Sequence, residues 1–117
     1  MQERNVCIGM LDFLKEKHAQ LYHFFAGPAL LVLPPSLQNR YQEIIHRPRD
    51  LEMIRLKSNQ GVYFDLSEFA DDVFLCFDNA KLFCSAYKEF RGVHDAAAAL
   101  AKHFQKRLDT ESRSTAN

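Results

Sequence analysis

The chain has 117 residues, 47% of them hydrophobic and 26% charged, and its 15 basic and 15 acidic residues give a formal charge of zero. One domain of this length buries roughly two thirds of its unfolded surface, so a fold without disulfide or metal support is expected. The balanced charge gives no overall attraction for nucleic acid or anionic membranes, and the apolar content excludes a disordered chain.

Three cysteines, Cys7, Cys76 and Cys84, form no CxxC pair, and two of them lie within helical apolar patterns. Such usage is typical of buried, reduced thiols in an intracellular protein. No apolar run approaches the ~20 residues that cross a bilayer. The first residues also lack the basic-then-apolar order of a signal peptide. We therefore expect a cytosolic or nuclear protein.

The first predicted helix covers residues 5–20, where apolar side chains recur at helical spacing. A strongly apolar segment follows at 21–41 and is interrupted by Gly27, Pro28, Pro34 and Pro35. Because proline removes a donor and disfavours helix in the residue before it, we expect a long apolar loop here. Loops of this length are usually functional, although this one could serve only to plug the core with its leucines.

Two short helical segments are expected next. Residues 41–45 are predicted to form one turn that ends before Pro48. Asp50 stands at N-cap spacing for a short helix that turns Leu51 and Ile54 inward, and the polar residues 58–61 end it.

The central feature of the sequence is a helix over residues 69–84, with apolar residues at i, i+4, i+7 or i+8, i+11 and i+14. Asp65 and Glu68 precede it at N-cap and N3 spacing, so their side chains can satisfy free backbone N–H groups. Five acidic residues lie in or beside this helix, and we interpret them as its solvent-facing side.

Residues 85–92 are expected to connect the central helix to a last helix over 93–108, whose apolar residues recur at helical spacing from Val93 to Leu108. The tail at 110–117 is predicted to be disordered. Strand signals are essentially absent. The sequence therefore predicts a single all-α domain at 1–109, a bundle of three long helices and one short one.

Four sequence motifs occur in order between residues 25 and 108. They read F-x-x-P from Phe25, I-I-x-x-P-x-D-L from Ile44, Y-x-D-x-x-E-F from Tyr63 and F-x-N-A-x-x-F from Phe77. None is specific alone, but their order and spacing resemble a bromodomain, which reads acetylated lysine. The resemblance implies an all-α, left-handed four-helix bundle with a long apolar loop between its first and second helices.

The resemblance also implies an acetyl-lysine pocket at one end of the bundle, between the long loop and the connector after the central helix. Phe25 and Ala29 would form its floor and wall beside the acetyl methyl group. Leu31 or Leu33 would close the loop side, and Tyr41 would hold a water molecule in the pocket.

The mouth of the implied pocket has alternative occupants. Val93 would stand there at the start of the last helix, although the alignment needs about three extra residues before it, so Tyr87 or Phe90 could line the mouth instead. The residues implied to form the pocket are Phe24, Phe25, Ala29, Leu31, Leu33, Tyr41, Phe83, Cys84, Phe90 and Val93.

The chain departs from the family pattern at the end of the central helix, where the family has tyrosine and then asparagine but this sequence has Phe83 and Cys84. In the family the asparagine amide donates to the acetyl carbonyl. A thiol is a weak donor and acceptor on a shorter side chain. Lys81 and Ser85 flank the position as candidate polar substitutes.

Two functions follow from this pattern. The first is an acetyl-lysine or acyl-lysine reader in a chromatin-associated, nuclear protein of transcription regulation, which binds acetylated histone tails or other nuclear proteins as a monomeric domain. The second is a degenerate bromodomain scaffold that contacts other chromatin-complex proteins without binding acetyl-lysine. An enzyme, a cofactor or a metal site is not expected, since the sequence lacks HxxxH spacing and a glycine-rich phosphate loop. Contact with a membrane or direct contact with nucleic acid is not expected either.

Overall fold

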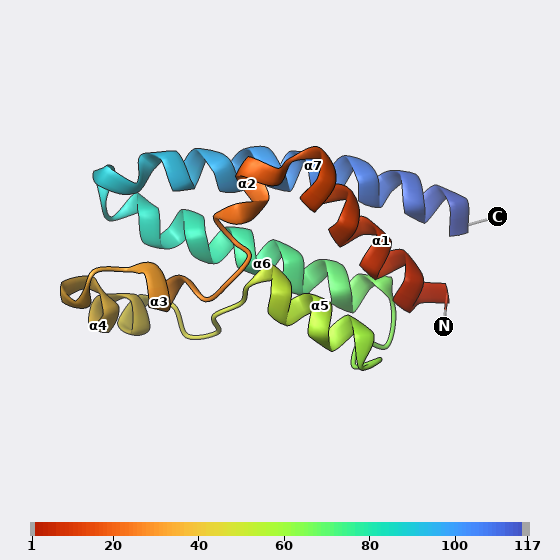
Figure 1. Ribbon diagram of the computed structural model, residues 1–117, viewed down its shortest axis with the longest axis horizontal. Helices are drawn as coiled ribbons and strands as arrows, with labels where there is room; N and C mark the ends of the chain where they lie inside the picture. The colour runs from red at the N-terminus through yellow and green to blue at the C-terminus, as the bar shows by residue number, and fades with distance from the viewer. Residues whose placement is uncertain (1, 116–117) are drawn as a thin grey trace.

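The computed structural model describes residues 2–115, and every regular element within them is helical. Four helices pack side by side as a bundle, and shorter elements fill the connections (Figure 1). The bundle helices are α1 (Gln2–Lys17), α5 (Leu51–Asn59), α6 (Leu66–Ser85) and α7 (Arg91–Thr115). The connecting elements are α2 (Ala19–His23), α3 (Ala29–Val32), α4 (Pro35–Ile44) and the 3-10 helix η1 (Lys88–Phe90). The predicted all-α four-helix bundle is confirmed.

Aspartate side chains begin two of the bundle helices, as the sequence predicts. Asp50 Oδ1 accepts the backbone N–H of Met53 at 2.8 Å, and Asp65 Oδ1 accepts that of Glu68 at 3.0 Å. Each bond satisfies a donor that the first helical turn leaves free. α5 ends near Gly61, whose φ of +72° lies in the left-handed region that glycine adopts without strain. The predicted N-caps of α5 and α6 are therefore confirmed, and α6 begins at Leu66, three residues before the predicted helix at 69–84.

The long connection predicted between the first and second helices of the bundle is present, but prolines divide it into short helices, so it is partly helical. Pro28 and Pro34 take extended backbone at the N-cap positions of α3 and α4, and Pro35 opens α4. Proline suits a first helical turn because the N–H that it lacks would have no partner there. The turn predicted at 41–45 is consequently the end of the longer helix α4.

The outer helices also differ in length from the prediction. The first helix ends at Lys17, and α2 follows at Ala19, instead of one helix up to residue 20. α7 continues to Thr115, so residues 110–115 are helical where a disordered tail is expected. Side chains four residues apart support this extension, as in the ion pair of Arg107 with Glu111 at 3.1 Å. Residues 116–117 lie outside the described residues, and the domain boundary at 109 stays a prediction.

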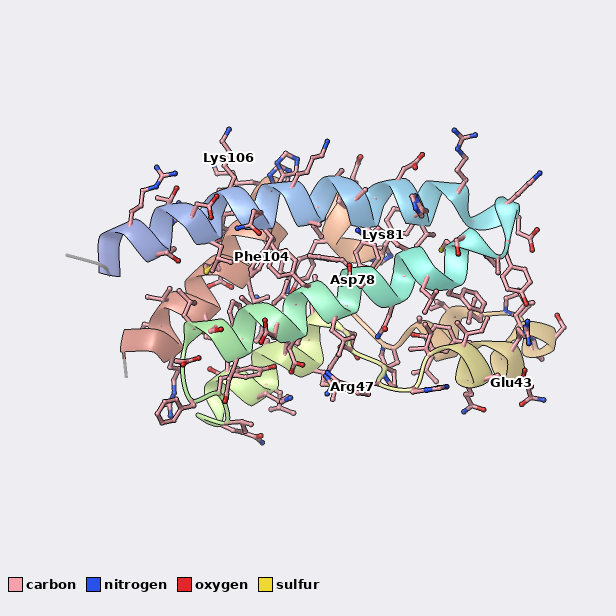
Figure 2. All side chains as sticks on the ribbon, turned by 180° about the vertical axis from the view of Figure 1, so that it is seen from behind. Glu43, Arg47, Asp78, Lys81, Phe104 and Lys106 are labelled. Carbon is pink, nitrogen blue, oxygen red and sulfur yellow. The ribbon has the colours of Figure 1, made fainter. Side chains whose placement is uncertain are left out.

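The main core lies between the four bundle helices. It includes Leu11 of α1, Ile54 of α5, Phe69 and Phe77 of α6 and Phe104 of α7, all fully buried. Figure 2 shows Phe104 directed from α7 into the bundle and Lys106, two residues later, directed away from it. A smaller apolar cluster joins α4 to the end of α6 through Tyr41, Ile45 and Phe83. This second cluster lies beside the site described below.

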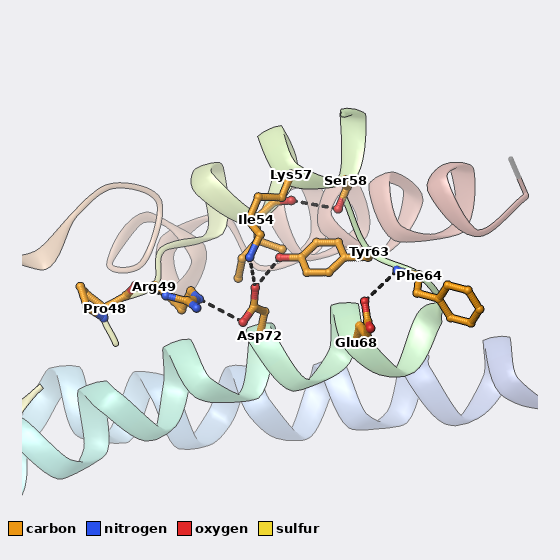
Figure 3. A network of polar contacts seen from close by, with 9 residues as sticks. All are labelled: Pro48, Arg49, Ile54, Lys57, Ser58, Tyr63, Phe64, Glu68 and Asp72. Atoms are coloured by element: carbon orange, nitrogen blue, oxygen red, sulfur yellow. Dashed lines mark hydrogen bonds and ion pairs between the residues drawn. The ribbon is translucent and has the colours of Figure 1, made fainter. Parts of the chain in front are cut away.

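A buried carboxylate holds three segments against α6 (Figure 3). Asp72 accepts hydrogen bonds from Arg49 Nε at 3.0 Å, Lys57 Nζ at 2.7 Å and the Tyr63 hydroxyl at 2.6 Å. Burial alone would raise the pKa of Asp72, but the bonds from Lys57, Tyr63 and Arg49 outweigh it and the pKa is lowered. Asp72 is therefore ionised at neutral pH, and it ties the loop before α5, α5 itself and the segment after α5 to α6.

Backbone hydrogen bonds fix the long connecting segment to the bundle. The N–H groups of Leu51 and Glu52 donate to the carbonyl oxygens of Phe25 and Ala26 at 2.8 and 3.1 Å. On the other side, Asn79 of α6 donates through Nδ2 to the carbonyl oxygen of Arg47 at 2.8 Å. The connection between α1 and α5 is therefore fixed by hydrogen bonds to the start of α5 and to α6. A cavity beneath this segment is bounded by a fixed wall.

Candidate functional site

An apolar cavity of about 150 Å³ opens at the end of the bundle where α6 passes into α7. The segment from α2 to α4 closes one side of it, and α6 and the start of α7 close the other. Its lining residues are Phe24, Phe25, Gly27, Ala29, Val32, Leu33, Tyr41, Arg49, Cys76, Ala80, Phe83, Cys84, Phe90 and Val93. All the residues predicted to form the pocket are in this set except Leu31.

On the loop side of the cavity, the structure distinguishes between the two predicted leucines, Leu31 and Leu33. Leu33 lines the cavity, whereas Leu31 is 76% exposed and does not. Val32, which the sequence analysis did not single out, contributes in its place although it is 82% exposed overall. Because α3 is helical, consecutive side chains point in different directions, and a loop prediction gives no information on which of them faces inward.

Two of the three candidates for the mouth contribute to the wall. Phe90 of η1 and Val93 of α7 line the cavity together, because η1 turns the connector back over the end of α6. Tyr87 lies behind the wall, with its ring centroid 5.0 Å from that of Phe83. Phe90 stacks at 6.1 Å on the same Phe83 ring. The connector is therefore an aromatic layer packed on Phe83.

The floor of the cavity consists of Phe25 and Tyr41. Phe25 is buried and meets Phe77 edge to face at 5.5 Å. Tyr41 is only 7% exposed and packs edge to face on Phe83 at 5.1 Å. Among residues 2–115 its hydroxyl has no hydrogen-bond partner, and burial raises the pKa of Tyr41, so it remains a neutral O–H group. A hydroxyl that belongs to a cavity lining and has no protein partner is suited to hold water or a ligand oxygen.

The two cysteines of the wall are neutral thiols. Burial raises the pKa of Cys84, partly offset by the backbone N–H of His94. Burial also raises the pKa of Cys76, and the carboxylates of Asp50 and Asp72 add to the effect. Neither thiol is therefore an activated nucleophile. Cys76 and Ala80 also line the cavity and are not among the predicted residues, although both stand at helical spacing before Cys84.

The candidate polar substitutes lie outside the wall. Lys81 pairs with Asp78 at 3.6 Å, and the Ser85 hydroxyl donates to the carbonyl oxygen of Leu82 at 2.7 Å. Arg49 is the charged member of the wall, and its Nε and Nη1 already bind Asp72 and the carbonyl oxygen of Pro48 at 3.0 and 2.8 Å. The cavity is thus apolar, with the Tyr41 hydroxyl as its main uncommitted polar group.

Neither a metal cluster nor a membrane span is found in the part of the chain that the structure describes. Histidine, cysteine and acidic side chains at 2–115 nowhere gather in threes that could hold a metal ion. The helices within the same range are too short or too polar to cross a bilayer. A helical bundle with an anchored apolar cavity at one end defines a binding module for a small group or a single side chain.

Comparison with known proteins agrees with this class. The bromodomain family profile matches residues 7–97. The chain is 36% identical over 104 residues to the bromodomain adjacent to zinc finger domain protein 2 of Caenorhabditis elegans. This alignment covers 89% of this chain and 7% of the relative. It is 34% identical over 85 residues to the human bromodomain adjacent to zinc finger domain protein 2B, covering 73% of this chain and 4% of the relative.

Solved structures show the same fold. The second bromodomain of cdg4_1340 from Cryptosporidium parvum, complexed with bromosporine, has a TM-score of 0.82 at 26% identity, with 92% of this chain and 87% of that chain covered. The second bromodomain of Candida albicans Bdf1, bound to an imidazopyridine, has a TM-score of 0.74 at 28% identity, with 92% and 97% covered. The chain belongs to the bromodomain family.

Proposed function

We propose that this domain is a reader of acylated lysine side chains in chromatin proteins, with weakened affinity for acetyl-lysine. The observation that carries the proposal is the unpartnered Tyr41 hydroxyl at the floor of an apolar cavity of about 150 Å³. An acylated lysine is uncharged at its end and combines an apolar chain with one carbonyl oxygen. Such a group suits an apolar wall and a single fixed hydroxyl.

The weakening follows from Cys84. A cysteine offers no amide N–H, so a carbonyl oxygen that enters the cavity loses one directional hydrogen bond. A missing bond of this kind inside a dry pocket costs on the order of 1–3 kcal/mol, which is a ten- to hundred-fold loss of affinity. The water-mediated bond from Tyr41 is unaffected by this change.

The relatives support a nuclear role in chromatin. They include the nucleosome-remodeling factor subunit NURF301 of Drosophila melanogaster and the SWR1 complex bromodomain subunit bdf1 of Schizosaccharomyces pombe. By analogy, the partners of this domain would be acetylated histone tails or other proteins of chromatin complexes. The proposed activity is binding without catalysis, and it needs no cofactor.

The direct test is an NMR titration of the domain with one peptide in acetylated and unmodified forms, since shift changes detect millimolar affinity. Acetyl-dependent shifts at Phe25, Tyr41 and Val93 are expected, because all three line the cavity. The unmodified peptide is the control for binding through its charges. Equal shifts with both peptides, or none at millimolar concentration, would contradict the reader function.

A scaffold without acyl-lysine binding is the second candidate function. Besides the thiol at position 84, it is favoured by apolar side chains on the surface near the mouth: Leu31 is 76% and Val32 82% exposed. Exposed apolar residues that gather in one area are typical of protein interaction sites. In the titration above, this function predicts no acetyl-dependent shift, while a protein partner would shift the resonances of α3.

A further inference from the structure

The α6 side of the cavity is built from small side chains. Cys76, Ala80 and Cys84 are four residues apart in turn, so they form one row along α6, and all three line the cavity. Ala80 ends at its β-carbon, and each cysteine extends one sulfur atom beyond it. An asparagine at position 84 would fill part of this space with its carboxamide group. The thiol therefore makes the row longer and more apolar as well as removing a hydrogen bond.

The opposite side of the cavity is apolar too. Phe25 and Ala29 belong to the segment that closes this side, Val93 of α7 adds another apolar side chain to the lining, and the guanidinium of Arg49 is committed to Asp72 and to the carbonyl oxygen of Pro48. The uncommitted polar group is the hydroxyl of Tyr41, a residue that is 7% exposed and lines the cavity, and this hydroxyl has no hydrogen-bond partner within residues 2–115. One polar point beside a row of small apolar groups is suited to a ligand with one oxygen and a hydrocarbon chain.

We propose that the cavity prefers butyryl-lysine to acetyl-lysine, with the extra methylene groups lying along Cys76, Ala80 and Cys84. This inference rests on the proposed function, that the cavity takes an acylated lysine. Burial of one methylene group is worth about fourfold in affinity, so two add roughly 15-fold if both leave water. The apolar chain thus offsets the amide hydrogen bond that Cys84 does not make.

The test is a titration of the folded domain with one peptide that carries acetyl, propionyl or butyryl on the same lysine. Affinity should rise along this series, with butyryl roughly 15-fold tighter than acetyl. If acetyl-lysine binds and butyryl-lysine binds no tighter, the chain-length preference is wrong while the reader function stands. If none of the three peptides shifts a resonance at millimolar concentration, the reader function itself fails and the preference fails with it.

Two variants examine the row directly. Ala80→Val places two methyl groups in its middle, and it should lower butyryl affinity about tenfold with a smaller effect on acetyl. Ala98→Val, a partly exposed alanine of α7 outside the cavity wall, is the matched control and should change neither affinity. Thermal melts check that both variants fold, since added bulk can destabilise a core.

If Ala80→Val does not fold, Cys84→Asn tests the same chain-length preference. The asparagine restores an amide donor and fills part of the row, so the affinity ratio of butyryl to acetyl should fall at least tenfold. An unchanged ratio in Cys84→Asn would show that the row does not determine the preference, and the inference would be abandoned.

Discussion

At the scale of single residues, the proposed function makes the side chain at position 84 the main determinant of how strongly a carbonyl oxygen is held. Cys84→Asn should raise acetyl-lysine affinity ten- to hundred-fold, because the amide N–H supplies a bond worth about 1–3 kcal/mol in a dry site. NMR or calorimetric titration measures the gain. Cys84→Ala is the control, since it removes the sulfur without adding a donor and should give no gain. A gain in both variants would mean that the sulfur merely obstructs the ligand.

The Tyr41 hydroxyl provides a second prediction at this scale. Tyr41→Phe should weaken acyl-lysine binding roughly three- to tenfold, since one bond to a water or ligand oxygen is lost. The free energy of unfolding should change by less than about 0.5 kcal/mol, because the hydroxyl has no protein partner among the described residues. Peptide titration and a denaturant melt measure the two quantities. A large loss of stability with unchanged binding would assign Tyr41 to the core alone.

The residues that line the cavity are largely predictable from the sequence. The motif order gave Phe25, Ala29 and Tyr41, which all line the cavity. Leu31 does not line the cavity, because the direction of its side chain is set by the helix α3. The prolines favour a loop prediction at this point, so the sequence does not reveal that helix. Cys76 and Ala80 were missed because they read as ordinary core residues of α6, and only the position of the cavity distinguishes them from the rest of that face.

At the scale of elements, Asp72 connects α6 to the segments around α5. Asp72→Ala should lower the free energy of unfolding by about 2–3 kcal/mol, because it leaves Arg49, Lys57 and Tyr63 without their shared acceptor. Chemical denaturation measures this loss. Asp71→Ala, its exposed neighbour, is the control and should have almost no effect. If the two variants lose equal stability, the loss comes from the helix and the network is unimportant.

Element boundaries were predictable where a side chain marks them. Asp50 and Asp65 define the starts of α5 and α6, and both caps are present. The prolines were ambiguous, because proline breaks a helix from within but also suits a first turn, and local sequence does not distinguish these cases. The extension of α7 beyond Leu108 depends on weak pairs such as Arg107 with Glu111, which polar composition alone does not reveal.

At the scale of the whole molecule, a stacked histidine pair joins α7 to the corner between α1 and α2. The ring centroids of His18 and His103 lie 3.8 Å apart, and Phe13 meets His18 edge to face. Burial and the charge of His103 lower the pKa of His18 below its usual 6.5. Arg107, over the Phe13 ring at 5.0 Å, adds another cation nearby. Protonation of His18 is therefore less favourable in the folded state than in the unfolded chain.

Stability should accordingly decrease in mild acid. Since the pKa of His18 is lower in the folded state, the unfolded chain takes up the proton first as the pH falls below about 6.5. The contribution of neutral His18 to the free energy of unfolding is complete above about pH 6.5. It is lost as the pH falls through the pKa that His18 has in the folded state. Melting temperatures from pH 7.5 to 5 measure this, and His103→Gln should flatten the profile. His23→Gln, an exposed histidine, should not, and a flattening there would contradict the assignment.

The two described ends of the chain lie together at one end of the bundle, while α3, α4 and η1 lie at the other (Figure 1). The molecule measures 49 Å along this axis, and the cavity opens at the end away from the termini. An extended chain spans about 3.3 Å per residue, so a tether needs about 15 residues to return along that length. In a longer protein, a flanking segment shorter than this cannot extend to the far end of the bundle, where α3, α4 and η1 lie.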